Sequence, residues 1–161
     1  MIRLLVSWLL RLTTAAALAI DAYVHADLAG VYDGNRFGAA ISQGNLFRVD
    51  AALAALAALV ILLSARRLSW SFAALVAAAG LGPILLYRYV DVGSLGPLPN
   101  MYEPIWYPEK TLTAIAEGVA IGTALLGLVF GAAPRRAGPR VITPAVGPVR
   151  HRVRALGHRP R

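Results

Sequence analysis

Five ionisable side chains lie in or beside long apolar stretches of the sequence, where they could carry chemistry. Asp21 and His25 are four residues apart in the first stretch, so on a helix they share one face. Asp50 lies near the start of the second stretch, Arg88 at the end of the third and Glu117 within the fourth. An ionisable group inside a membrane costs about 2.5–3.5 kcal/mol on insertion scales, so each needs a partner or a purpose. These residues are our candidates for a ligand-binding or ion-binding site.

Three interpretations of these residues remain open. The first is a structural network that ties the helices together, in which Arg88 pairs with Asp50 or Asp91 and His25 hydrogen-bonds an acid. The second is an outward-opening site for a small ligand, a lipid headgroup or a proton. The third is a metal site with Asp21, His25 and Glu117 as ligands, because one imidazole with several carboxylate oxygens suits a hard or borderline divalent ion.

Several other chemistries find no support in the sequence. The absence of cysteine excludes iron–sulfur clusters, disulfides and thiol redox chemistry. A haem held between two histidines within a membrane is excluded as well, because His151 and His158 both lie near the C-terminus. We find no Gly-x-Ser-x-Gly turn, phosphate-binding loop or His-Glu-x-x-His motif. The sequence therefore identifies no cofactor and favours a non-enzymatic protein, although it leaves the question of an enzyme open.

The elements that carry these residues are predicted to cross a membrane. Hydrophobic residues make up 58% of the chain and charged residues only 15%, against about 45–50% and about 25% in soluble domains. A helix of about 20 apolar residues spans the hydrocarbon core of a bilayer. The apolar stretches predict spans at about residues 10–28, 46–64, 68–87 and 109–130. Arg3 and Arg11 would flank an extension of the first helix at the cytoplasmic interface.

The predicted fold is an all-α membrane protein with two regions. Residues 1–133 form a four-helix transmembrane bundle with a short extracytoplasmic hairpin and cap, and residues 134–161 form a disordered Arg/Pro-rich cytoplasmic tail. Counted from the outer ends of their helices, Asp21 and Glu117 both lie about seven residues deep, roughly 10 Å below the outer surface. We expect these two carboxyl groups to meet, with Asp50 and Arg88 above them near the mouth of the bundle.

The two outer loops are predicted to be ordered. Asp33-Gly34, flanked by aromatic residues, favours a tight turn and a short hairpin over residues 31–37. The second loop, residues 89–107, combines prolines with aromatic residues, a composition typical of a rigid, irregular cap. The candidate partner surface on this cap consists of Tyr102, Glu103, Trp106 and Tyr107. The alternative for its aromatic residues is an interfacial belt.

The basic residues are distributed asymmetrically. Twelve of the sixteen Lys and Arg fall on the side of the N-terminus, the 65–68 turn and the C-terminal tail. By the positive-inside rule this side is cytoplasmic, which predicts a multi-pass protein of the cell membrane with both termini inside. The tail has eight arginines and no acid, so we expect it to attract anionic lipid headgroups. It has no aromatic residue to stack on bases, which argues against nucleic acid as a partner.

The layout of four helices, two outer loops and a basic inner tail resembles uncharacterised four-span integral membrane proteins of high-GC actinobacteria. Small multidrug transporters also have four helices and an acid in the first, where Asp21 stands here, but they are shorter and use a glutamate. The leading hypothesis is a non-enzymatic accessory or assembly subunit that contacts another membrane protein, or a second copy, through its outer loops and tail. The alternative is a carrier or binding protein for a small ligand, ion or proton at the Asp/His/Glu group.

Overall fold

The computed structural model describes residues 1–131, and their regular elements are helices. They are α1 (Ile2–Ala29), α2 (Gln43–Leu63), α3 (Arg67–Tyr89), α4 (Pro108–Leu126) and the π-helical turn η1 (Gly127–Gly131). All four α-helices are long and apolar enough to cross a membrane. Within these residues no strand forms, and the only bridge is an isolated one. The predicted all-α, four-span fold is therefore confirmed, while the predicted tail, residues 134–161, lies outside the described residues.

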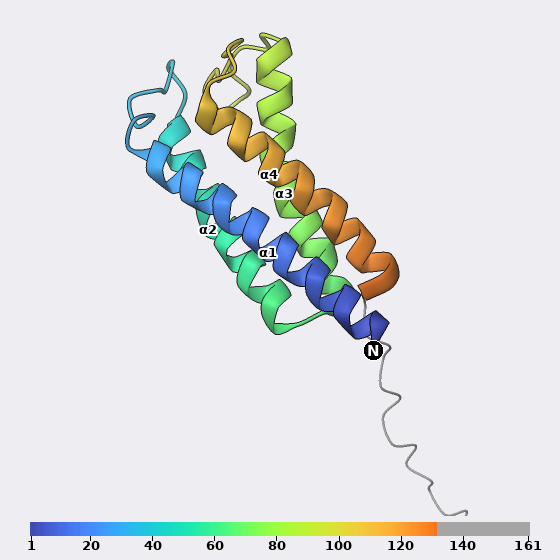
Figure 1. The fold of residues 1–161 in the computed structure, drawn as a ribbon. Coiled ribbons are helices and arrows are strands. Elements are labelled where there is room, and N and C mark those ends of the chain that lie inside the picture. Colours follow the sequence, from blue (N-terminus) through green and yellow to red (C-terminus); the bar gives the residue numbers. More distant parts are fainter. Residues whose placement is uncertain (132–161) are drawn as a thin grey trace, which may run out of the picture.

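The four helices form one bundle in which each packs mainly against two others (Figure 1). The neighbouring pairs are α1–α2, α2–α3, α3–α4 and α4–α1. The N-terminus and the turn between α2 and α3 lie at one end of the bundle, and the two long loops, residues 30–42 and 90–107, lie at the other. Side chains at one depth on different helices can therefore meet in the interior.

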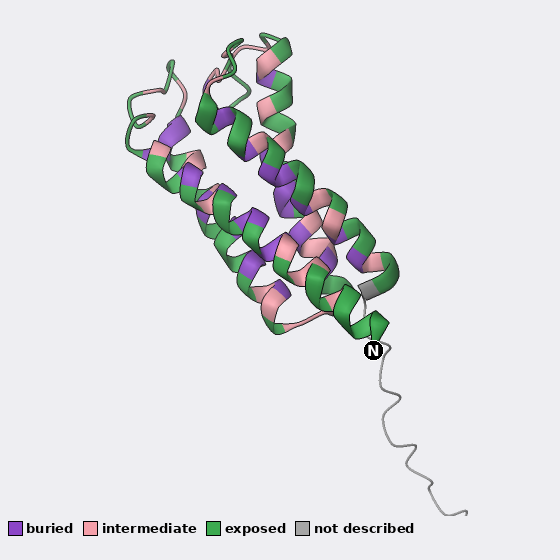
Figure 2. Cartoon of the chain, viewed as in Figure 1, coloured by how far each residue is buried: buried purple, intermediate pink, exposed green. Residues whose placement is uncertain are grey.

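Small side chains fill the interior of the bundle, and large aliphatic side chains cover its outside. The fully buried residues include Ala54, Ala57, Ala73, Ala77 and Ala120. On the other face of α2, Leu56 and Leu59 are 49% and 58% exposed, and Figure 2 shows such exposed residues along the outer faces of the helices. A bundle that faces lipid needs no large apolar core, since hydrocarbon solvates leucine well and small residues let helix backbones approach closely. The packing thus agrees with the predicted membrane location.

Local sequence signals set the starts of the helices. α2 begins after Ser42, whose hydroxyl accepts a hydrogen bond from the Asn45 amide at 3.1 Å. α4 begins at Pro108 with Glu109 in its first turn, where proline and an acid are both favoured. α1 begins at Ile2, so the extension expected before residue 10 is a continuous part of the first helix.

Two close contacts fasten the end of the bundle opposite the long loops. Arg11 donates hydrogen bonds from Nε to the Ile61 carbonyl, at 2.9 Å, and from Nη2 to the Leu62 carbonyl. These carbonyls belong to the last turn of α2, where carbonyls lack helical partners and positive charge is favoured. Arg11 therefore joins α1 to α2, in addition to any contact with the membrane interface. At the same end of the bundle, Gly127 lies against the Trp70 indole so closely that a Cβ would overlap the ring.

The first outer loop contains the predicted turn but not the strands of a hairpin. The Asn35 amide donates to the Tyr32 carbonyl at 3.1 Å, which closes a turn around Asp33 and Gly34. The chain after this turn does not pair with the chain before it. Instead the loop is fastened to the start of α2, since the Gly44 amide donates to the Tyr32 carbonyl at 3.0 Å. The prediction of a hairpin was wrong. The backbone amide of Gly44, in the first turn of α2, has no partner within the helix and bonds the Tyr32 carbonyl instead of leaving the loop to pair with itself.

The second outer loop is an ordered, irregular cap, as its proline content predicts. The Ile41 amide donates to the Pro97 carbonyl at 3.1 Å, which joins the two outer loops. The Glu103 amide donates to the Tyr87 carbonyl at 3.1 Å, which fastens the loop to the last turn of α3. The cap therefore covers the end of the bundle toward which the interior polar residues lie.

Candidate functional site

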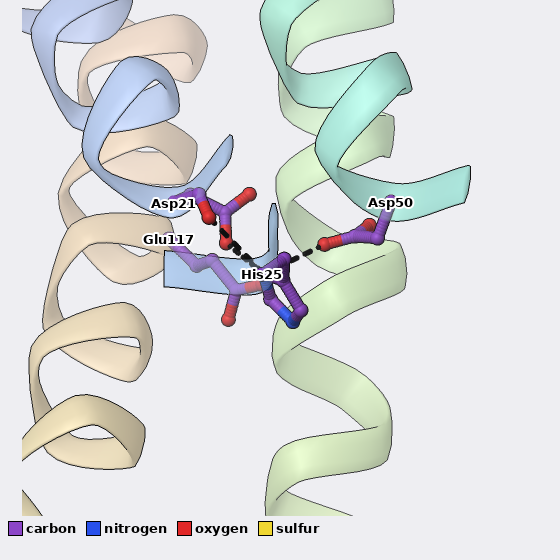
Figure 3. Close-up of side chains that lie close together, drawn as sticks. All are labelled: Asp21, His25, Asp50 and Glu117. Atoms are coloured by element: carbon purple, nitrogen blue, oxygen red, sulfur yellow. Dashed lines mark hydrogen bonds and ion pairs between the residues drawn. The ribbon is translucent and has the colours of Figure 1, made fainter. Parts of the chain in front are cut away.

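Four polar side chains from three helices meet in the interior of the bundle (Figure 3). Asp21 and His25 project from α1, Asp50 from α2 and Glu117 from α4. One ligand atom from each residue lies within 4.8 Å of those of the other three. The expected meeting of the Asp21 and Glu117 carboxyl groups therefore occurs. We call these four residues the polar cluster.

His25 links the two aspartates of the polar cluster. Its Nδ1 atom lies 2.8 Å from Asp21 Oδ1 and 3.1 Å from Asp50 Oδ2. Phe47 packs edge to face on the imidazole, with ring centroids 5.0 Å apart and planes at 78°, and so limits rotation of the ring. Because Nδ1 carries at most one proton, it cannot donate a full hydrogen bond to both carboxylates. One of the two contacts is thus left without a good donor.

The polar cluster is deeply buried and contains oxygen atoms without partners. Glu117 is 0% exposed and Asp21 is 1% exposed. Both carboxyl oxygens of Glu117, and Oδ2 of Asp21, have no hydrogen-bond partner within residues 1–131. A buried carboxylate without a hydrogen bond or a counter-charge is costly, so these oxygens need a proton or a partner that residues 1–131 do not provide.

α3 contributes space to the polar cluster, not a ligand atom. A Cβ at Gly80 would overlap Glu117 Oε1 and lie 3.4 Å from Asp50 Oδ2. A Cβ at Gly82, two residues further along the same helix, would meet nothing within 4 Å. A side chain at position 80 would therefore force the Glu117 carboxyl group to move from its place in the polar cluster.

Asp50 lies deeper than the sequence predicted. It was expected above the other residues near the mouth of the bundle, yet it contacts His25 directly. The reason is the start of α2, which is Gln43 and not residue 46. Asp50 is therefore seven residues into its helix, about 10 Å along the axis, which matches the estimated depth of Asp21 and Glu117.

Arg88 is not part of the polar cluster, and within residues 1–131 it forms no ion pair with Asp50 or Asp91, so the pairing expected in the structural interpretation was wrong. Its guanidinium carbon lies 5.1 Å from the centroid of the Tyr89 ring and 5.7 Å from that of Trp106. The physical reason is depth, because Arg88 follows Gly80 by eight residues, about 12 Å of helix. Arg88 thus lies beside aromatic rings at the outer end of α3, where cation–π contacts are favourable.

Other basic side chains near the outer end are engaged elsewhere. Lys110 Nζ donates to the Glu103 carbonyl at 2.6 Å. Arg48 pairs with the Asp33 carboxylate at 2.5 and 2.8 Å and, through these hydrogen bonds, holds the pKa of Asp33 below its usual value. In the described part of the chain, no Lys or Arg forms an ion pair with the polar cluster. Apart from His25, the cluster therefore has no neighbouring positive charge from residues 1–131.

A cavity of about 310 Å³ extends from the polar cluster to the outer loops. Its inner wall includes His25, Asp50 and Gly80, and Met101 lines it from the second outer loop. Pockets that hold small ligands have volumes of about 300–1,000 Å³, so the size suffices for a small ligand. Among the lining residues, Thr113 is 2% exposed and its hydroxyl has no partner within residues 1–131.

The candidate partner surface on the second outer loop divides into two parts. Tyr107 and Glu103 contact the first outer loop, since the Tyr32 hydroxyl lies 3.1 Å from the Tyr107 hydroxyl and 3.5 Å from Glu103 Oε2, although the Glu103 side chain is 36% exposed. Burial raises the pKa of both tyrosine hydroxyls, so they remain neutral. Tyr102 and Trp106 remain 40% and 39% exposed. These two aromatic residues and the Glu103 side chain are the parts of the predicted surface that are accessible to a partner or to lipid headgroups.

No protein-family model, curated protein or solved structure matches this chain. The fold and the site therefore define the class of protein on their own. It is an all-helical protein with four candidate membrane spans and a buried cluster of three carboxyl groups and one imidazole in its interior.

Proposed function

We propose that this chain is a membrane-embedded binding protein or carrier whose polar cluster holds a cation, in the form of a metal ion, a protonated small ligand or a proton. One observation carries the proposal. Three carboxyl groups and one imidazole meet within 4.8 Å, and no Lys or Arg of residues 1–131 forms an ion pair with them.

The charge balance supports a cation. His25 supplies at most one positive charge for the carboxyl groups of Asp21, Asp50 and Glu117. Charges of one sign that lie close together away from water repel strongly, and burial removes the hydration that would screen them. The arrangement is therefore stable only when protons or another positive charge neutralise it.

The cavity supports access from the end of the bundle that carries the long loops. It connects the polar cluster with residues of the second outer loop, including Leu98 and Met101. By the positive-inside rule, the basic residues at the opposite end would face the cytoplasm of a cell membrane. In this proposal the cation therefore enters from outside the cell.

The test uses the full chain purified in a mild detergent. Glu117→Gln removes one carboxylate from the polar cluster, and Asp27→Asn removes an exposed carboxylate of the same protein as a matched control. Thermal stability is followed during titrations with metal chlorides, small organic amines and acid. We expect at least one of these additions to raise the Tm of the wild type and of Asp27→Asn, with little effect on Glu117→Gln. The proposal is wrong if Glu117→Gln and Asp27→Asn respond alike to every addition.

A second candidate is the accessory or assembly subunit. Its supporting observation is the exposure of Tyr102 and Trp106 on the second outer loop, since aromatic residues are enriched at protein interfaces. We expect a stoichiometric partner to co-purify in mild detergent and to be lost from the double variant Tyr102→Ser, Trp106→Ser. Recovery of the wild-type chain alone would count against this candidate.

A further inference from the structure

We infer that the polar cluster is a site for one divalent transition-metal ion of the Mn²⁺, Fe²⁺ or Zn²⁺ class, with Asp21, His25, Asp50 and Glu117 as its ligands. This inference rests on the proposed function, because it names the cation that the polar cluster binds. It adds a specific coordination shell, which a proton site or an organic-cation site does not require.

The spacing of the donor atoms fits a coordination shell. Metal–ligand bonds of about 2.1 Å place adjacent ligand atoms of an octahedron about 3.0 Å apart. His25 Nδ1 lies 2.8 Å from Asp21 Oδ1 and 3.1 Å from Asp50 Oδ2. These two separations have the length of octahedral edges. With a neutral imidazole protonated at Nε2, Nδ1 offers its lone pair to an ion that the two aspartates also reach.

Glu117 provides separate evidence for a ligand. It is 0% exposed, and neither of its carboxyl oxygens has a hydrogen-bond partner within residues 1–131. Its carboxyl group points toward His25 (Figure 3). A metal ion between these two side chains would bind Glu117 and also the second oxygen of Asp21, which likewise lacks a partner. The carboxyl oxygens that residues 1–131 leave without a hydrogen bond are thus atoms that could bind a metal ion.

The absence of a side chain at Gly80 leaves space beside α3 for the Glu117 carboxyl group. Any side chain at this position would occupy the place of Glu117 Oε1 and crowd Asp50. The nearby Gly82 has no such neighbour and serves as a control.

The donor set selects the class of metal. An imidazole nitrogen with carboxylate oxygens suits Mn²⁺, Fe²⁺ and Zn²⁺. Ca²⁺ and Mg²⁺ prefer shells made of oxygen alone. Soft ions such as Cu⁺ prefer sulfur ligands, and none of the four residues of the polar cluster carries sulfur. We therefore expect the site to discriminate against Mg²⁺ and Ca²⁺.

The experiment measures metal binding to the full chain in detergent after treatment with EDTA. MnCl₂ binding is followed by electron paramagnetic resonance, and ZnCl₂, MgCl₂ and CaCl₂ are titrated by calorimetry. We expect one Mn²⁺ per chain, displacement by Zn²⁺, at least tenfold weaker binding of Mg²⁺ and Ca²⁺, and a nitrogen coupling from His25 in the Mn²⁺ spectrum. Glu117→Gln and His25→Gln should each weaken binding at least tenfold, whereas Asp27→Asn should not. Asp50→Asn replaces His25→Gln if that variant does not fold.

Each outcome decides the inference. Tight metal binding that both cluster variants retain places the ion elsewhere and overturns it, as does equal affinity for Mg²⁺ or Ca²⁺. Stabilisation of the wild type by protons or amines but not by any metal overturns the metal inference and leaves the proposed function standing. Absence of a response to every cation overturns both.

Discussion

The substitution Glu117→Gln should change the stability of the bundle in opposite directions with and without a bound cation. The amide keeps the size of the side chain and its hydrogen-bonding capacity but removes its charge. Ligand atoms of the polar cluster lie within 4.8 Å of one another, so each pair of ionised carboxylates repels by about 3.5 kcal/mol or more at an effective dielectric constant of about 20. Glu117 takes part in two such repulsions, with Asp21 and Asp50, and a protonated His25 offsets about one of them. Without a cation, the variant should therefore be more stable than the wild type by about 3.5 kcal/mol, and by less where a carboxyl group has already taken up a proton.

A saturating cation should reverse this order. A ligand at a thousand times its Kd stabilises the folded protein by about 4.1 kcal/mol, which exceeds the repulsion of about 3.5 kcal/mol, and the variant should gain little of this stabilisation. The assay is thermal unfolding in detergent at a mildly alkaline pH, once with EDTA and once with MnCl₂, with Asp27→Asn as the control. The reasoning would be refuted if Glu117→Gln were strongly destabilised both with EDTA and with MnCl₂. Glu117 would then be part of a structural hydrogen-bond network.

Three further predictions concern packing and charge around the bundle. Gly80→Ala should weaken cation binding at least tenfold because its Cβ displaces the Glu117 carboxyl, whereas Gly82→Ala should leave binding unchanged; calorimetric titration compares the two. Gly127→Ala should destabilise the bundle by about 1–3 kcal/mol, since the added methyl overlaps an indole ring, and thermal unfolding would show a lowered Tm. The folded-state pKa of Asp33 is depressed, so its stabilising contribution is present above the unfolded pKa and is lost as the pH falls through the folded one. Asp33→Asn should accordingly lose less thermal stability than the wild type on acidification below about pH 4, and an equal loss would contradict this origin.

Much of the fold could be predicted from the sequence because membranes impose simple rules. Long apolar stretches must be helical where they face lipid, so the existence of four spans follows from composition and length. The depth of a residue follows from helical rise, and this is why Asp21 and Glu117 were expected to meet. Distances along a single helix can be calculated from residue numbers alone, because the rise per residue is constant.

The errors arose where helix ends or helix rotation mattered. The level of Asp50 was misjudged because α2 starts earlier than its apolar stretch, although Ser42 is of a residue type favoured at helix N-caps. The importance of Gly80 was missed because nothing in the sequence distinguishes it from Gly82. Which of the two faces the polar cluster depends on the rotation of α3, and this rotation is set by packing against α2 and α4.

The most direct test of the central claim is anomalous diffraction from crystals of the full chain grown with MnCl₂. If the polar cluster binds a metal ion, we expect one anomalous peak inside the bundle. It should lie about 2.2 Å from His25 Nδ1 and from carboxyl oxygens of Asp21, Asp50 and Glu117. A structure without a peak at this position, or one in which Glu117 turns toward lipid, would contradict this claim.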